Sequence, residues 1–163
     1  MLKSLFKKKK STNLYAPLSG EVVNIEDVPD SVFNQKMMGE GIAIKPETNE
    51  VIAPFDGEII QLFETSHAIG LKDNHGNEVL IHIGLDTVEL KGEGFTAMVK
   101  QGDKVTKGQV LISLDLDNLN KNAKDMITPI VVTNSSDNNM KIEFSNESRA
   151  IVGETILMNI DKE

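Results

Sequence analysis

Hydrophobic residues in this chain fall into short runs separated by turn-forming Gly, Pro, Asn and Asp residues. Runs of this length, rich in Val, Ile and Leu, are typical of β-strands. The predicted strands are Gly20–Ile25, Gly41–Lys45, Gly57–Glu64, Ala68–Lys72, Glu78–Gly84, Val110–Leu114, Ile130–Val132 and Thr155–Ile160. Many short strands with few helix signals predict an all-β fold, an antiparallel β-sandwich or barrel-sandwich hybrid with a few short helical turns.

Two segments carry helical signals. Residues Asp115–Ala123 predict a helix in which Asp117 is the N-cap, and Gly94–Lys100 predicts a shorter helical turn. Residues Gly102–Gln109 have glycine near both ends and predict a compact hairpin.

The chain also contains a weak internal repeat. Residues Ala16–Val23 resemble residues Ala53–Ile60, with Ala-Pro at the start and Gly-Glu four residues later in both. Two copies of one strand-entry motif suggest a duplicated half.

One predicted strand carries a histidine inside an apolar run. Side chains alternate between the two faces of a strand. Alternation places Val79, Ile81, Ile83 and Leu85 on one face and Leu80, His82 and Gly84 on the other. The first face is predicted to be core, and the glycine leaves space beside His82. A titratable group in such a place is a candidate site, and a core histidine satisfied by one hydrogen bond is the alternative.

A second histidine is predicted to meet the first. His67 and His82 are 15 residues apart, and the turn residues around His75 lie midway between them, where His75 itself is expected to be exposed. A hairpin closed by that turn would put His67 and His82 on neighbouring strands. In an extended segment Phe63, Thr65 and His67 would share one face, so that the Thr65 hydroxyl can bond the His67 ring.

Two neutral imidazoles allow two kinds of chemistry. They can hold a metal ion with a third ligand, or one can attack phosphorus while the other donates a hydrogen bond to the phosphoryl oxygens. The chain has no glycine-rich phosphate loop and no Walker lysine, so direct use of ATP is not expected.

The composition excludes several kinds of site and of binding partner. The chain has 163 residues, the size of one domain, and no Cys, which excludes disulfides, thiolate metal sites and a cysteine nucleophile. From Ser11 onward it holds 12 basic against 25 acidic residues, a net charge of −13. With this acidic body, no Trp and 4% aromatic residues, nucleic-acid binding is not expected.

The first residues differ from the rest in charge. Residues 1–13 are predicted to be a basic, flexible tail, and residues 14–163 the folded domain. Leu2, Leu5 and Phe6 beside the lysines would allow at most weak contact with an anionic membrane, the alternative being a solvated tail. No stretch has the length of a membrane span or the features of a secretory signal, so a cytoplasmic protein is expected.

The residues around His82 resemble a known family. Residues Gly76–Phe95 closely resemble the phosphohistidine signature of the glucose-type enzyme IIA proteins of the phosphoenolpyruvate-dependent sugar phosphotransferase system. The resemblance extends from about Tyr15 to Ile160. Further matches are Ala16–Gly20, Ile25–Asp30, Gly39–Pro46, Thr65–Ala68 and Gly153–Thr155.

The resemblance implies a role for each residue of the pair. His82 matches the histidine phosphorylated on Nε2 by the phosphocarrier HPr, and His67 the second active-site histidine. Thr65 matches the residue that orients His67, and Gly84 the position whose carbonyl accepts the Nδ1 proton of His82. The phosphoryl group then passes to a cysteine of an enzyme IIB domain, and no cofactor is required.

The resemblance also implies a docking surface. Its apolar positions correspond to Phe33, Met38, Phe63 and Leu80, and its acidic positions to Asp30, Asp86 and Glu89. Gly84 is the eighth residue expected at this surface. Some relatives have larger aromatic residues at Leu80 and Ile83, which changes the shape of this surface. Regulated permeases or kinases are further candidate partners, and a monomer is expected.

Three other readings stay open. A zinc hydrolase would use the His67/His82 pair, but Ile81-His82-Ile83 lacks the second histidine of a His-x-His element; a zinc ion could still bind the pair where a partner supplies a carboxylate. Residues Gly102–Gln109 resemble a hairpin of lipoyl and biotinyl carrier domains. Those domains carry the modified lysine at a tight hairpin tip, in a Met-Lys-Met or Asp-Lys-Ala context, and no such lysine follows here. The third alternative is a purely regulatory binding protein, which keeps the His67/His82 pair but has lost phosphoryl transfer.

Overall fold

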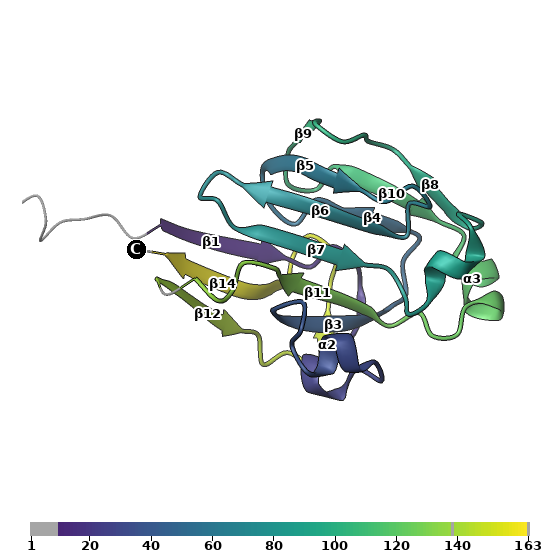
Figure 1. Ribbon diagram of the computed structural model, residues 1–163, viewed down its shortest axis with the longest axis horizontal. Helices are drawn as coiled ribbons and strands as arrows, with labels where there is room; N and C mark the ends of the chain where they lie inside the picture. Colours follow the sequence, from purple (N-terminus) through teal and green to yellow (C-terminus); the bar gives the residue numbers. More distant parts are fainter. Residues whose placement is uncertain (1–9, 138, 163) are drawn as a thin grey trace, which may run out of the picture.

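The computed structural model describes residues 10–137 and 139–162, and antiparallel strands dominate this part of the chain (Figure 1). The largest sheet has eight strands, each antiparallel to its neighbours. In order across the sheet they are β13 (Arg149–Ala150), β2 (Gly20–Asn24), β3 (Glu40–Pro46), β11 (Thr128–Val132), β7 (Glu78–His82), β6 (Ala68–Asp73), β5 (Gly57–Leu62) and β9 (Lys104–Val105). The all-β fold predicted from the strand pattern is confirmed.

Two smaller sheets complete the sandwich. One contains β1 (Lys10–Tyr15), β14 (Ile156–Lys162) and β12 (Met140–Phe144), and the other β4 (Glu50–Ile52), β10 (Val110–Leu114) and β8 (Phe95–Ala97). All eight predicted strands are present. The predicted helical turn at Gly94–Lys100 is wrong, because this segment forms β8, which pairs with β10.

The helices are short and lie between strands. They are η1 (Ile25–Asp27), α2 (Ser31–Asn34), η2 (Thr87–Leu90) and α3 (Leu116–Asn122). The helix predicted at Asp115–Ala123 is confirmed, but its N-cap is Asp115, whose side chain accepts from the Asn118 amide; Asp117 lies in the first turn. None of these helices is long and apolar enough to cross a membrane in the residues that the structure describes.

The first described residues form strand β1 of the small sheet that also contains β14 and β12. Lys10–Asn13 were predicted to belong to the flexible tail, and this is wrong because β1 pairs with β14 from Lys10 onward. The side chains of Thr12 and Leu14 are buried, which explains why these residues are ordered despite their polar neighbours. The rest of the predicted tail, with Leu2, Leu5 and Phe6, lies outside the described residues.

The first residues of the two copies of the sequence repeat lie side by side, whereas their strands, β2 and β5, are separated by four other strands of the large sheet. The amide of Tyr15 donates to Pro54 O at 3.0 Å, and the amide of Ile52 donates to Pro17 O at 3.1 Å. The predicted hairpin at Gly102–Gln109 does not form, because β9 pairs with β5 whereas β10 pairs with β4 and β8.

The large sheet buries side chains on both of its faces. On β7, Val79 and Ile81 belong to the main core, and Leu80 belongs to a second, smaller cluster. We call this second group the site cluster; it comprises Ile25, Val28, Phe33, Ala43, Ala68, Leu80, Leu85, Ile127 and Val131, with Val23 and Phe63 packed against it. The alternation of strand residues therefore supplies one face for folding and the opposite face for a surface site.

Candidate active site

His82 is the last residue of β7, and the chain turns immediately after it. The amide of Ile83 still donates to His67 O at 2.7 Å, and Gly84 then adopts a φ of 81°. Leu85 was predicted to share a face with Val79, but it belongs to the site cluster instead. The strand alternation is lost at Gly84, because a positive φ reverses the direction of the chain.

The same glycine determines the protonation of His82. Nδ1 of His82 lies 2.7 Å from Gly84 O, and a carbonyl oxygen only accepts hydrogen bonds. Nδ1 therefore carries the proton in the neutral ring, and Nε2 retains its lone pair. A side chain at Gly84 would force its surroundings to shift, since its Cβ would lie 2.5 Å from the Thr87 methyl group.

His67 comes from a turn just before β6. The prediction that Phe63, Thr65 and His67 form an extended segment is wrong, because the Ser66 amide donates back to Phe63 O and Ser66 has a φ of 58°. The turn nevertheless brings the Thr65 hydroxyl to 2.5 Å from Nδ1 of His67, the contact that the sequence predicts. The His67 side chain is 4% exposed.

The two histidine rings are in contact. Ala68 pairs directly with His82 in the β6–β7 hairpin, so the preceding residue, His67, lies beside the end of β7. The ring centroids of His67 and His82 are 5.1 Å apart at an interplanar angle of 80°. Phe33 packs against His82 at 5.2 Å and Phe63 against His67 at 5.4 Å, so four rings follow one another across the site.

Burial keeps both histidines neutral. Removal from water lowers the pKa of His67 from 6.5 to about 4, and the neighbouring His82 contributes in the same direction. Burial also lowers the pKa of His82, although the bond to Gly84 O and the charges of Asp30 and Asp86 oppose this effect. At neutral pH Nε2 of His82 is therefore available as a nucleophile.

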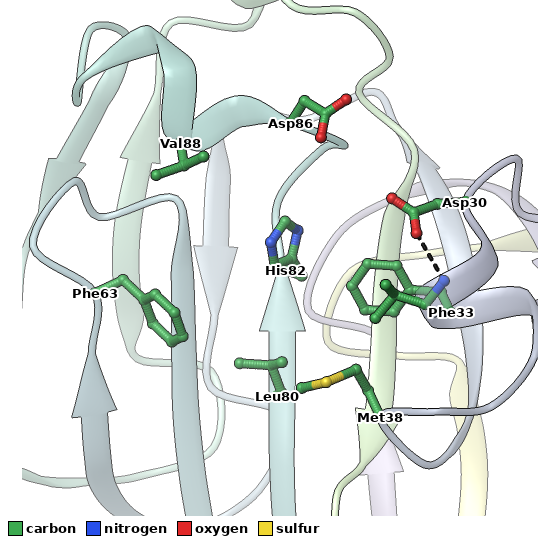
Figure 2. Close-up of a pocket in the computed structure, with 9 residues that line it drawn as sticks. Asp30, Phe33, Met38, Phe63, Leu80, His82, Asp86 and Val88 are labelled. Carbon is green, nitrogen blue, oxygen red and sulfur yellow. Dashed lines mark hydrogen bonds between the residues drawn. The ribbon is translucent and has the colours of Figure 1, made fainter.

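An apolar pocket surrounds His82 (Figure 2). Its lining residues are Asp30, Val32, Phe33, Met38, Phe63, Leu80, His82, Asp86 and Val88. Six of the eight predicted docking residues are among them. Of the other two, Gly84 is buried and Glu89 is exposed on η2, and neither lines the pocket.

Sequence reasoning missed two residues of the pocket. Val32 is 40% exposed and Val88 is 53% exposed, which is unusual for large apolar side chains. Val32 follows the N-cap of α2 and Val88 lies in η2. No sequence signal marked them, because neither helix was predicted at these positions.

The two carboxylates at the rim are held in different ways. Asp30 is the N-cap of α2 and accepts a hydrogen bond from the Val32 amide at 2.9 Å. Asp86 adopts a φ of 56°, and the Lys124 ammonium lies 3.3 Å from its Oδ2. In Figure 2 both carboxylates lie at one side of the His82 ring.

The third histidine lies elsewhere. His75 is in the turn at the opposite end of the β6–β7 hairpin, and its Nδ1 is 3.1 Å from the Thr12 hydroxyl. It is half-buried by β1, so the prediction of a freely exposed side chain is wrong. Across residues 10–137 and 139–162, no three His, Cys, Asp or Glu side chains gather where they could hold a metal ion.

Comparison with known proteins identifies the family of this chain. Residues 12–138 match the family described as phosphoenolpyruvate-dependent sugar phosphotransferase system, EIIA 1. A Staphylococcus aureus protein named PTS system glucose-specific EIIA component is 48% identical over 164 residues, covering 98% of both chains. A longer Staphylococcus carnosus protein, the PTS system glucoside-specific EIICBA component, is 50% identical over 145 residues, covering 89% of this chain and 21% of its own.

A solved structure shares the fold. The glucose permease IIA from Mycoplasma capricolum superimposes with a TM-score of 0.84 at 33% sequence identity, covering 92% of this chain and 96% of its own. The resemblance seen in the sequence is confirmed, and the chain belongs to the EIIA 1 family of the phosphoenolpyruvate-dependent sugar phosphotransferase system.

Proposed function

We propose that this protein carries a phosphoryl group on Nε2 of His82 during sugar uptake, receiving it from phosphorylated HPr and passing it to a cysteine of an enzyme IIB domain. The observation that carries the proposal is the neutral His82 ring, whose Nδ1 is bonded to Gly84 O while the ring lines an apolar pocket. Its relatives are named as glucose-specific, which makes glucose the first sugar to test.

The transfer needs no cofactor. The Nε2 lone pair of His82 attacks phosphorus, a new N–P bond forms, and the N–P bond of the donor histidine breaks, leaving that histidine neutral. The proton on Nδ1 stays in its bond to Gly84 O and stabilises the positive charge of the phosphorylated ring. His67 can donate from Nε2 to a phosphoryl oxygen when the Thr65 hydroxyl donates to its Nδ1.

The pocket suits a transient partner. Phe33, Met38 and Leu80 supply an apolar contact surface, which excludes water from a phosphohistidine that hydrolyses easily. Asp30 and Asp86 give this surface a negative rim, which attracts a basic partner and speeds its encounter. The surface is open enough for a donor and an acceptor to use it in turn.

The acceptor cysteine belongs to another domain or another protein, because this sequence has no Cys. The EIICBA relative carries its matching segment within a chain whose name includes B and C components, and this supports an enzyme IIB partner for the present protein. Both partners would meet it in the cytoplasm.

The test is phosphoryl transfer in vitro. The protein is mixed with phosphoenolpyruvate, enzyme I and HPr, and its intact mass is followed for wild type, His82→Ala, His67→Gln and the matched control His75→Gln. One acid-labile phosphoryl group is expected on all except His82→Ala. If wild type acquires no phosphoryl group, or if His82→Ala acquires one, the proposal is wrong.

A zinc ion at the same pair is a second proposal. The contact between the His67 and His82 rings would allow two imidazole ligands, with a carboxylate from a partner as the third. Calorimetric titration with zinc, with and without a partner, tests it; heat that does not depend on both histidines would exclude it. The comparisons give no support to a zinc hydrolase or a carrier domain.

A further inference from the structure

The turn that follows β7 has an unusual backbone. Between Ile83 and Thr87, both Gly84 and Asp86 have positive φ angles, of 81° and 56°. Residues other than glycine rarely adopt this conformation, and they keep it only where the surrounding structure holds them in place. The Gly84 carbonyl that bonds His82 belongs to this turn, so whatever holds the turn also holds the ring.

Each of the two peptide groups that flank Gly84 has its own anchor. The peptide group between Ile83 and Gly84 is held through its carbonyl, which accepts a hydrogen bond from the Thr87 hydroxyl at 2.6 Å. The peptide group between Gly84 and Leu85 is held through its amide, which donates to Asp125 O at 2.8 Å. Its carbonyl, on the opposite side, then faces Nδ1 of His82.

Thr87 is the one side chain among these anchors. It is 0% exposed, and both of its branches are used. The hydroxyl bonds Ile83 O, while the methyl group packs so closely on Gly84 that a Cβ there would lie 2.5 Å from it. Thr87 therefore holds the peptide group before Gly84 through its hydroxyl, while its methyl group fills the space beside Gly84.

We propose that Thr87 is a positioning residue for His82: it holds Gly84 so that the carbonyl keeps the proton on Nδ1 and leaves Nε2 free to react. Neutral imidazole in water prefers the opposite tautomer, in which Nε2 carries the proton and cannot attack. The effect on transfer rests on the proposed function, whereas the effect on the tautomer rests only on this geometry.

Two variants separate the contribution of the Thr87 hydroxyl from that of its methyl group, and a third variant is the control. Thr87→Val retains the shape and the methyl group but removes the hydroxyl, and Thr87→Ser retains the hydroxyl but removes the methyl group. Thr133→Val is a control for the same chemical change at an exposed site: the Thr133 hydroxyl also donates to a backbone carbonyl, Glu78 O at 3.3 Å, at the start of β7 far from His82. If Thr87→Val does not fold, Thr87→Ala takes its place with the same expectations.

The tautomer of His82 is measured by nitrogen-15 NMR of the ring, with the signals assigned from His67→Gln and His75→Gln samples. Wild type, Thr87→Ser and Thr133→Val are expected to carry the proton on Nδ1, and Thr87→Val to show a mixture of tautomers. Loss of one buried hydrogen bond changes an equilibrium by about ten-fold. Since the rate follows the fraction of competent protein, kcat for transfer from phosphorylated HPr should fall by up to about ten-fold with little change in KM.

The proposal fails if folded Thr87→Val keeps the wild-type tautomer, or if Thr87→Ser is as impaired as Thr87→Val. A general loss of stability cannot mimic the expected result, because it would not move the ring proton of the folded protein. If wild-type protein accepts no phosphoryl group at all, the proposed function fails, and the NMR result still decides the role of Thr87.

Discussion

Acid should destabilise this fold through His67. Burial lowers its pKa from 6.5 to about 4, so the unfolded chain binds a proton in a pH range where the folded protein does not. Stability from this residue is therefore complete above about pH 6.5 and is lost as the pH falls toward 4. Each pKa unit corresponds to about 1.4 kcal/mol, so the shift predicts a total loss of about 3 kcal/mol. The side chain is 4% exposed, so solvent screening does not reduce this figure much.

The measurement is urea unfolding of wild type and His67→Gln at several values between about pH 7.5 and pH 4.5. The wild type should lose about 2 to 3 kcal/mol more than the variant over this range, because glutamine does not titrate. Groups that titrate with folding far from His67 contribute equally to both proteins and cancel in the comparison, whereas His82 is coupled to His67 and its pKa is followed in the same NMR titration. An NMR titration of the His67 ring gives its pKa directly. The reasoning is refuted if His67 titrates near 6.5, or if the two proteins lose stability in parallel.

Three further predictions concern the site and its support. Gly84→Ala should cost at least about 2 kcal/mol of stability in thermal unfolding, because alanine resists a φ of 81° and its Cβ would meet the Thr87 methyl group at 2.5 Å; wild-type stability would contradict this. Asp30→Asn and Asp86→Asn should slow transfer from phosphorylated HPr several-fold at low salt and very little at about 0.5 M salt, because they remove charge from the rim while asparagine suits both backbone positions; a salt-independent defect would exclude steering. Asp73→Ala should cost about 3 kcal/mol in urea unfolding and leave transfer unchanged, because this buried carboxylate accepts four hydrogen bonds at the far end of the hairpin; a loss of transfer in the folded variant would contradict that separation.

The strand pattern predicted most of the longer strands but missed β1 and β12, and it predicted the small elements poorly. Strands β7 and β11 are nearly continuous runs of buried residues, and such apolar runs are visible in the sequence. Strands β9 and β13 have two residues each, too few for any period to show. The segment that forms β8 was predicted to contain a helical turn, but pairing with β10 decided its conformation.

The histidine pair was predictable because its contact depends on one local hairpin. Once the chain between His67 and His82 closes a hairpin at its central turn, their spacing places them on neighbouring strands. The predicted reason for the Thr65 contact was wrong, since the segment is a turn with Ser66 in the left-handed region. The geometry of that turn depends on the strands at both of its ends.

By itself, the sequence determined which faces of the strands are apolar, that two histidines meet at the end of one hairpin, and that the folded body is acidic. These properties follow from the composition of the chain, from the alternation of side chains along a strand, and from contacts between residues close together in the sequence. Only the tertiary structure decided that Phe33 and Asp30 reach His82 from a helix about fifty residues away in the chain, and that Thr87 supports the Gly84 carbonyl. It also decided the lowered pKa values, because desolvation depends on everything packed around a ring, and that packing exists only once distant segments have come together.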